Sequence, residues 1–118
     1  MNVKVIDIIG TSIAISTDKG KVLLNAIQNS LHNDSTVIVD FEGISDLTTA
    51  FLNVAIGHLY NDFSGKELNE KLIIKNLDEL DMYLVAQVIE RVKLNQQKEG
   101  EEEFNKLISE VLDDDENS

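Results

Sequence analysis

The apolar residues at the start of the chain form two short runs separated by a turn. Residues 3–9 (VKVIDII) are mostly aliphatic, with Lys4 and Asp7 among them, and residues 13–15 (IAI) form the second run. Short β-branched runs on either side of a Gly-Thr-Ser turn are typical of paired strands. We therefore expect a β-hairpin at the start of the chain.

The spacing then changes to that of an amphipathic helix. Ser16, Thr17 and Asp18 supply N-cap candidates, and after them apolar residues recur about every 3.6 positions up to His32. The members of this stripe are Val22, Leu23, Ala26, Ile27 and Leu31. The pattern predicts a first helix.

A compact β-branched run follows at residues 36–41 (TVIVDF). Such a run without proline is typical of a strand buried on both faces, so we expect a central strand here. The next apolar stripe predicts a helix over residues 48–63, and Ser64 with Gly65 is expected to end it. The members of that stripe are Phe51, Leu52, Ala55, Ile56, Leu59, Tyr60 and Phe63.

Another strand and a third helix complete the predicted domain. Residues 71–75 (KLIIK) predict the strand, and residues 78–97 predict the helix, with Asp78 or Asp81 as its cap. The expected apolar face of this helix consists of Met82, Val85, Ala86, Ile89 and Val92. Alternating strands and helices imply parallel strands joined by right-handed crossovers. The predicted fold class is α/β, with one domain over residues 1–97 and helices packed on a mixed four-stranded sheet.

The remaining residues have a different character. Residues 98–103 are a charged break, and residues 113–118 carry like charges that we expect to leave the end of the chain disordered. Between them, five apolar residues follow helical spacing: Phe104, Leu107, Ile108, Val111 and Leu112. This pattern predicts a short amphipathic helix. Its apolar face packs either on the protein's own sheet and helices or on a partner protein, which includes a second subunit in a homodimer.

Composition bounds the class of protein. A chain of 118 residues with 42% hydrophobic and 27% charged residues is sufficient for one globular domain. Its net charge of −12 disfavours nucleic acid and anionic membrane surfaces as partners. Residues 99–118 contain nine carboxylates and one lysine, which account for −8 of that charge. The beginning of the chain lacks an apolar signal segment, so we expect a soluble cytoplasmic protein.

Few residues offer catalytic or metal-binding chemistry. There is no cysteine, and the two histidines, His32 and His58, would need carboxylate help to hold a metal. Ser45 and His58 occur on one loop-helix segment, but nothing in the pattern holds that imidazole against a nucleophile. No glycine-rich phosphate loop is present. We expect no enzymatic activity, no cofactor and no metal.

Residues 37–52 (VIVDFEGISDLTTAFL), continuing to residues 56–60 (IGHLY), resemble the central motif of the STAS-like domain family. They also resemble, more distantly, anti-sigma-factor antagonists, in which a serine after the central strand is phosphorylated by a partner kinase. The matching positions are Asp40, Gly43 and Ile44 in the strand and loop, Thr48 at the loop aspartate, Thr49 at the first serine and Ala50 at the phosphorylated serine. Since Ala50 has no hydroxyl, the resemblance does not carry the phosphorylation switch to this chain.

The loop at residues 45–51 is the first candidate contact site. Asp46, Thr48 and Thr49 place short polar groups at the start of the predicted helix, where free N–H groups favour an anionic group of a partner. The alternative is that one of these residues only caps the helix. The second candidate surface consists of Phe104, Leu107, Ile108 and Val111.

These observations favour a binding module over an enzyme. The resemblance implies a non-enzymatic regulatory or signalling domain, with a histidine-kinase-like ATPase as the expected partner. The alternative is an acidic decoy that imitates nucleic acid and inhibits a DNA-binding protein. A decoy requires carboxylates distributed over a folded face, so the position of the charges separates the two hypotheses.

Overall fold

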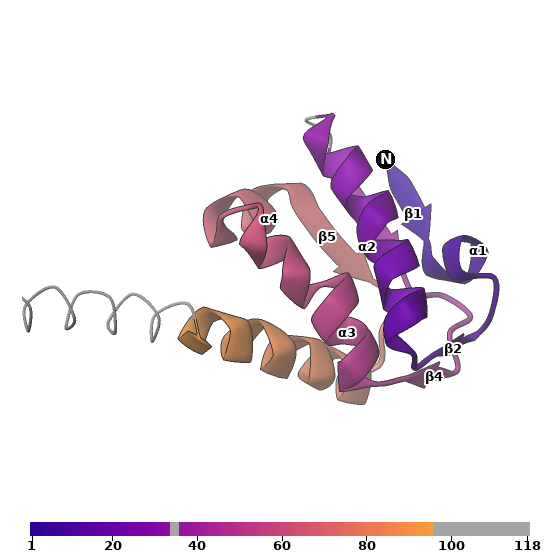
Figure 1. The fold of residues 1–118 in the computed structure, drawn as a ribbon. Helices are drawn as coiled ribbons and strands as arrows, with labels where there is room; N and C mark the ends of the chain where they lie inside the picture. Colours follow the sequence, from indigo (N-terminus) through magenta and orange to yellow (C-terminus); the bar gives the residue numbers. More distant parts are fainter. Residues whose placement is uncertain (34–35, 96–118) are drawn as a thin grey trace, which may run out of the picture.

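The computed structural model describes residues 1–33 and 36–95 (Figure 1). Ten elements follow one another along the chain: β1 (Asn2–Lys4), α1 (Val5–Ile9), β2 (Ile13–Ala14), α2 (Thr17–His32), β3 (Val37–Asp40), β4 (Asp46–Leu47), α3 (Thr49–Ala55), the 3₁₀-helix η1 (Gly57–Asn61), α4 (Gly65–Lys71) and β5 (Leu72–Lys75). A further helix is described over residues 79–95. The amphipathic helix and the acidic end expected beyond residue 97 lie outside the described residues.

The main sheet has three parallel strands in the order β1-β3-β5. Val39 of β3 is in register with Val3 on one side and Ile74 on the other. The prediction of a central strand at residues 36–41 is therefore confirmed. Parallel neighbours need long crossover connections, which α2 provides before β3 and α3 with α4 provide before β5.

The predicted N-terminal hairpin is wrong. Residues 5–9 form α1, because Val5 and Ile9 stand one helical turn apart and both side chains are buried. Gly10 ends this turn with a positive φ of 74°, and its N–H donates to the Ile6 carbonyl oxygen at 3.0 Å. As a result β2 pairs with β4 in a separate two-stranded parallel sheet. The expected mixed four-stranded sheet is replaced by parallel sheets of three and two strands.

The single helix expected over residues 48–63 is also wrong. The chain is α-helical only in α3, continues in the tighter η1, and then begins α4. Ser64 starts that helix, because its Oγ accepts from the Glu67 N–H at 3.1 Å and the Glu67 carboxylate accepts from the Ser64 N–H in a capping box. Gly65 is therefore the first residue of α4, and it does not adopt a positive φ.

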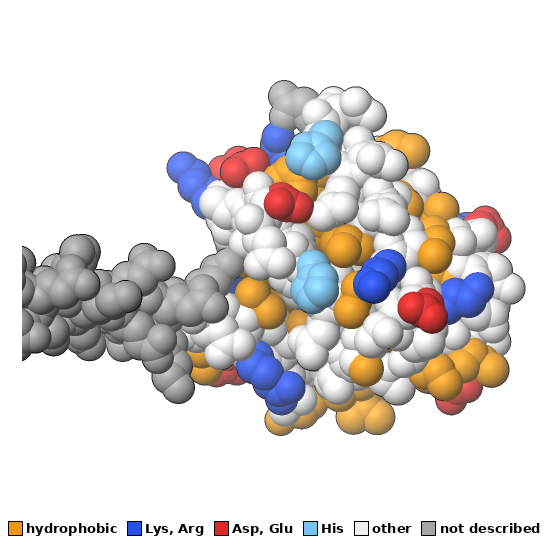
Figure 2. Space-filling view, in the orientation of Figure 1, with side chains coloured by type: hydrophobic (Ala, Val, Ile, Leu, Met, Phe, Trp, Pro, Cys, Tyr) orange, Lys and Arg blue, Asp and Glu red, His pale blue; other side chains and the backbone are white. Residues whose placement is uncertain are grey.

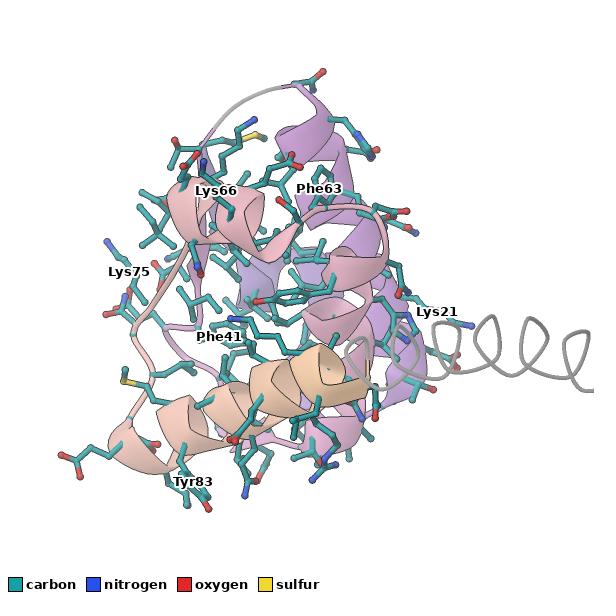
Figure 3. All side chains as sticks on the ribbon, turned by 90° about the vertical axis from the view of Figure 1, so that its left-hand side faces the viewer. Lys21, Phe41, Phe63, Lys66, Lys75 and Tyr83 are labelled. Atoms are coloured by element: carbon teal, nitrogen blue, oxygen red, sulfur yellow. The ribbon has the colours of Figure 1, made fainter. Side chains whose placement is uncertain are left out.

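The core lies between the main sheet and the helices in front of it (Figure 1). Its fully buried side chains include Leu23 and Ile27 of α2, Val39 of β3 and Phe51 of α3. Figure 3 shows Phe41 inside this layer and Lys75 on the outside, away from α2. Among the described residues, no helix is long and apolar enough to cross a membrane.

The helix of residues 79–95 is rotated relative to the prediction. Asp78 caps it as expected, with Oδ1 accepting from the Asp81 N–H at 2.8 Å. Val85 and Val88 are buried, whereas Met82 is 59% exposed and Ala86 is exposed. The buried residues that pack on the domain therefore follow helical spacing from Val85. The sequence pattern also placed Met82 and Ala86 on this face, and both are exposed.

Candidate functional site

The loop expected to make contacts is held by the two-stranded sheet. Ile13 is in register with Asp46, and Ala14 with Leu47. The Ser45 N–H donates to the Ser12 carbonyl oxygen at 2.9 Å, and the Thr48 N–H donates to the Ala14 carbonyl oxygen at 3.2 Å. Residues 45–48 are therefore fixed to the segment before α2, which the predicted hairpin would not have allowed.

Thr48 is the N-cap of α3. Its Oγ1 accepts from the Phe51 N–H at 3.2 Å, and its hydroxyl donates to the Ile15 carbonyl oxygen at 2.9 Å. The hydroxyl thus both caps the helix and joins α3 to the end of β2. Because both functions are structural, Thr48 is less available to a partner than its neighbours.

The other two polar candidates of the loop do not cap the helix. The Asp46 side chain is exposed and accepts from the Ser45 hydroxyl at 3.3 Å. Thr49, the first residue of α3, is half-buried. Ala50, at the position of the antagonists' phosphorylated serine, is exposed. The loop therefore presents Asp46 and part of Thr49 to solvent.

Two isoleucines lie beside these polar groups. Ile13 is 45% exposed and Ile15 is 48% exposed, while Ala14 between them is buried. Because residues in register on adjacent strands point to the same side of a sheet, Ile13 and Asp46 share the outer face. We call the group Ile13, Ile15, Ser45, Asp46 and Thr49 the β2–β4 surface. The sequence pattern did not indicate its isoleucines, because it placed them in a hairpin.

The candidate residues Phe104, Leu107, Ile108 and Val111 lie outside the described residues. For these positions the two expectations from the sequence, packing on the protein itself or on a partner, both remain predictions. The described candidates come together only at the β2–β4 surface.

Asp40 joins the ends of β3 and β5. Its Oδ1 accepts from the Asn76 side-chain amide at 2.7 Å and from the Glu42 N–H at 2.9 Å, and the side chain is 5% exposed. The Asn76 amide lowers the pKa of Asp40 most, followed by the Glu42 N–H, with Lys75 and Lys4 adding to the effect and desolvation opposing it. Asn76 adopts a positive φ of 64°, which the bond to Asp40 helps to hold. This arrangement has a structural role, since the carboxylate already has its partners.

The lowered pKa of Asp40 predicts an acid-dependent loss of stability. A carboxylate with a depressed folded-state pKa contributes stability above its unfolded value of 3.8, and the contribution is lost as the pH falls through the lower folded value. We expect the difference in unfolding free energy between wild type and Asp40→Asn to be constant near neutrality and to shrink below about pH 4. Urea unfolding at a series of pH values measures it; a pH-independent difference contradicts the assignment.

In the part of the chain that the structure describes, the histidines do not form a site together with other ligands. The His32 ring lies against Phe63 with ring centroids 5.0 Å apart and an interplanar angle of 42°. His58 is exposed in η1, and the Ser45 hydroxyl donates to oxygen atoms of Ser12 and Asp46. Within residues 1–33 and 36–95, no group of three or more histidines and carboxylates could hold a metal ion.

The charges of the described residues are mixed. These residues include eight lysines and arginines and twelve aspartates and glutamates, which gives a net charge of −4. Figure 2 shows side chains of both signs interspersed on the face that it presents. A nucleic-acid decoy needs carboxylates gathered over a folded face, and this part of the chain offers no such concentration. The decoy hypothesis gains no support here.

The fold and the loop define a small parallel α/β domain whose central strand leads into a polar segment at the start of a helix. The family model described as "STAS-like domain of unknown function (DUF4325)" matches residues 19–82, which is more than half of the chain. The chain therefore belongs to this STAS-like family, and the resemblance seen in residues 37–60 is confirmed. Comparison with curated proteins and with solved structures gives no match.

Proposed function

We propose that this protein is a non-enzymatic protein-interaction domain and that a partner protein binds the β2–β4 surface. The observation that carries the proposal is the pair of half-exposed isoleucines, Ile13 and Ile15, beside the exposed carboxylate of Asp46. Apolar side chains surrounded by polar groups are the usual composition of a protein interface. Ser45 and Thr49 supply the hydroxyls at its margin.

The rigidity of the surface supports binding. Backbone hydrogen bonds from Ser45 and Thr48 and the Thr48 side-chain bond to Ile15 fix the loop before any partner arrives. A contact surface that is ordered in advance loses less conformational entropy on association. The β2–β4 surface is thus better suited to a stable contact than a flexible loop of the same composition.

The resemblance to STAS-like domains favours a histidine-kinase-like ATPase as the partner. In the related antagonists a phosphorylated serine controls such an interaction, and here Ala50 occupies that position. Binding in this protein therefore does not depend on a phosphate at residue 50. Asp46 already places a negative charge on the β2–β4 surface, which suits a partner with a basic contact patch.

The test uses the full chain as bait in a lysate of its natural source, followed by affinity measurement with the captured protein. We expect Ile15→Glu to weaken binding about tenfold or more, because it places a charge at the apolar part of the surface. Thr49→Asp should strengthen binding, because it adds a second carboxylate beside Asp46 opposite the basic patch of the partner. The same change should leave α3 stable, since aspartate is favourable in a first helical turn.

The matched control is Ile73→Glu, because Ile73 is 46% exposed and belongs to β5 in the main sheet. It makes the same chemical change at nearly the same exposure, away from β2 and β4. Equal affinity of the Ile15→Glu and wild-type proteins for the captured partner, or an equal loss in both glutamate variants, contradicts the proposed surface.

A further inference from the structure

The helix of residues 79–95 exposes more apolar side chains than its packing requires. Leu80, Met82, Tyr83 and Leu94 are between 57% and 69% exposed. They make up four of the ten large hydrophobic side chains that are exposed in the described part of the chain. Figure 3 shows Tyr83 pointing away from the body of the protein. Exposed apolar side chains gathered on one helix mark an interaction surface.

The outward residues of this helix follow a regular spacing. Glu79, Tyr83, Ala86, Glu90 and Lys93 are separated by four, three, four and three positions and are all exposed. This is the alternation that places side chains along one stripe of a helix that pairs with another helix. The stripe turns away from the residues buried against the domain, which include Val85 and Val88. Lys93 lies at the edge of the stripe, where its side chain also approaches Gly65.

The stripe is complementary to itself when two copies run antiparallel. If Ala86 faces Ala86 of the second copy, Glu79 comes opposite Lys93 at both ends, so opposite charges meet twice. Tyr83 comes near Glu90; its hydroxyl oxygen already accepts from the Gln87 amide at 3.0 Å, which leaves the hydroxyl proton to donate to the Glu90 carboxylate. In a parallel pair, each of these charges would instead face a like charge.

The shape of the surface agrees with this register. A hollow of about 420 Å³ lies along the same helix, and it is lined by Ala86, Ile89, Glu90, Lys93 and Leu94. In the antiparallel arrangement, the Met82 and Tyr83 side chains of the second copy arrive beside Ile89 and Glu90. An alanine at the centre lets the two helices approach closely, and the hollow receives the larger side chains.

We propose that two copies of this chain associate through antiparallel pairing of their 79–95 helices about a two-fold axis at Ala86. The contact involves one helix from each copy, so it buries less area than the roughly 1,600 Å² of a standard stable interface. Association is therefore weak and depends on protein concentration. This dimer surface uses other residues than the β2–β4 surface, and a dimer would carry two of the latter.

Sedimentation analysis of the full chain over a range of concentrations tests the proposal. We expect a reversible monomer–dimer equilibrium that Ala86→Glu abolishes, because this change places two carboxylates on the symmetry axis. Glu79→Lys and Lys93→Glu should each weaken the dimer by about tenfold, since each reverses two ion pairs. The double variant Glu79→Lys/Lys93→Glu should recover most of the wild-type affinity, because it exchanges the charges and keeps them complementary.

Val22→Glu is the matched control, since Val22 is 45% exposed on α2 and the change adds the same charge as Ala86→Glu. It should leave the equilibrium unchanged, and circular dichroism should show the same helix content in all variants. A wild-type chain that stays monomeric up to about 1 mM overturns the proposal, because its affinity would then be negligible. So does a dimer that Ala86→Glu does not weaken, and so does failure of the double variant to recover.

Discussion

Replacement of Phe51 by alanine is expected to lower the free energy of unfolding by about 3–5 kcal/mol. The Phe51 side chain is fully buried where α3 packs against α2, the pair of helices with the most extensive mutual contact. Its removal deletes a large apolar group and leaves a cavity that the surrounding helices fill only in part. Urea unfolding followed by circular dichroism measures the loss.

Phe63→Ala is the matched control for this prediction. Phe63 is half-buried, and its ring contacts that of His32. The same substitution there removes less buried area and leaves a space open to water, so the loss should be clearly smaller than for Phe51→Ala. Equal losses at the two positions would contradict the placement of Phe51 at the centre of the core.

Gly20→Ala is expected to destabilise the protein even though it adds a good helix former. Gly20 is buried in α2, and a β-carbon there would lie 2.9 Å from the Phe51 carbonyl oxygen and 3.1 Å from the Val54 β-carbon. The gain in helix propensity is about 1 kcal/mol, whereas overpacking a filled site costs about 1–3 kcal/mol. Because the nearer atom is backbone, we expect the packing cost to exceed the gain.

Gly65→Ala provides the comparison within the same chain. A β-carbon at Gly65, the first residue of α4, would have ordinary contacts, with Lys93 at 3.8 Å and Tyr60 at 3.9 Å. This variant should be as stable as wild type or slightly more stable. A Gly20→Ala protein that melts at or above the wild-type temperature would show that α2 and α3 do not approach as closely as described.

The sequence predicted the elements whose signals were long or chemically distinct. Helix α2 is sixteen residues long, and its N-cap is Ser16, whose hydroxyl accepts from the Lys19 N–H. The β-branched run of β3 lies between two parallel neighbours, β1 and β5. In both cases the local preference of the residues agrees with the environment that the fold provides.

The elements that were predicted wrongly are short and depend on distant contacts. Residues 5–9 have the composition of a strand, but β1 is already paired with β3, and the burial of Val5 and Ile9 selects a helical turn. Ser64 and Gly65 suit either the end or the start of a helix, and only Glu67 in the capping box decides for the start. Patterns of five residues do not resolve such alternatives.

The candidate site was predicted in part. Thr48 was one of three residues expected to cap the helix, and hydrogen bonds to Phe51 and Ile15 show that it does. The exposed isoleucines of the β2–β4 surface depend on the parallel pairing of β2 with β4, which joins residues 33 positions apart. Such a pairing leaves no local signal in the sequence. The contact of Asp40 with Asn76 was missed for the same reason.

The most direct test of the proposed function is a methyl NMR titration of the isoleucine-labelled full chain with its captured partner. Methyl groups report contacts at individual side chains, and Ile13, Ile15 and Ile73 are all nearly half-exposed. We predict that the Ile13 and Ile15 methyl resonances shift or broaden as the partner is added, while the Ile73 resonance does not move. Unchanged Ile13 and Ile15 resonances in a saturated complex would contradict the assignment of the β2–β4 surface as the binding site.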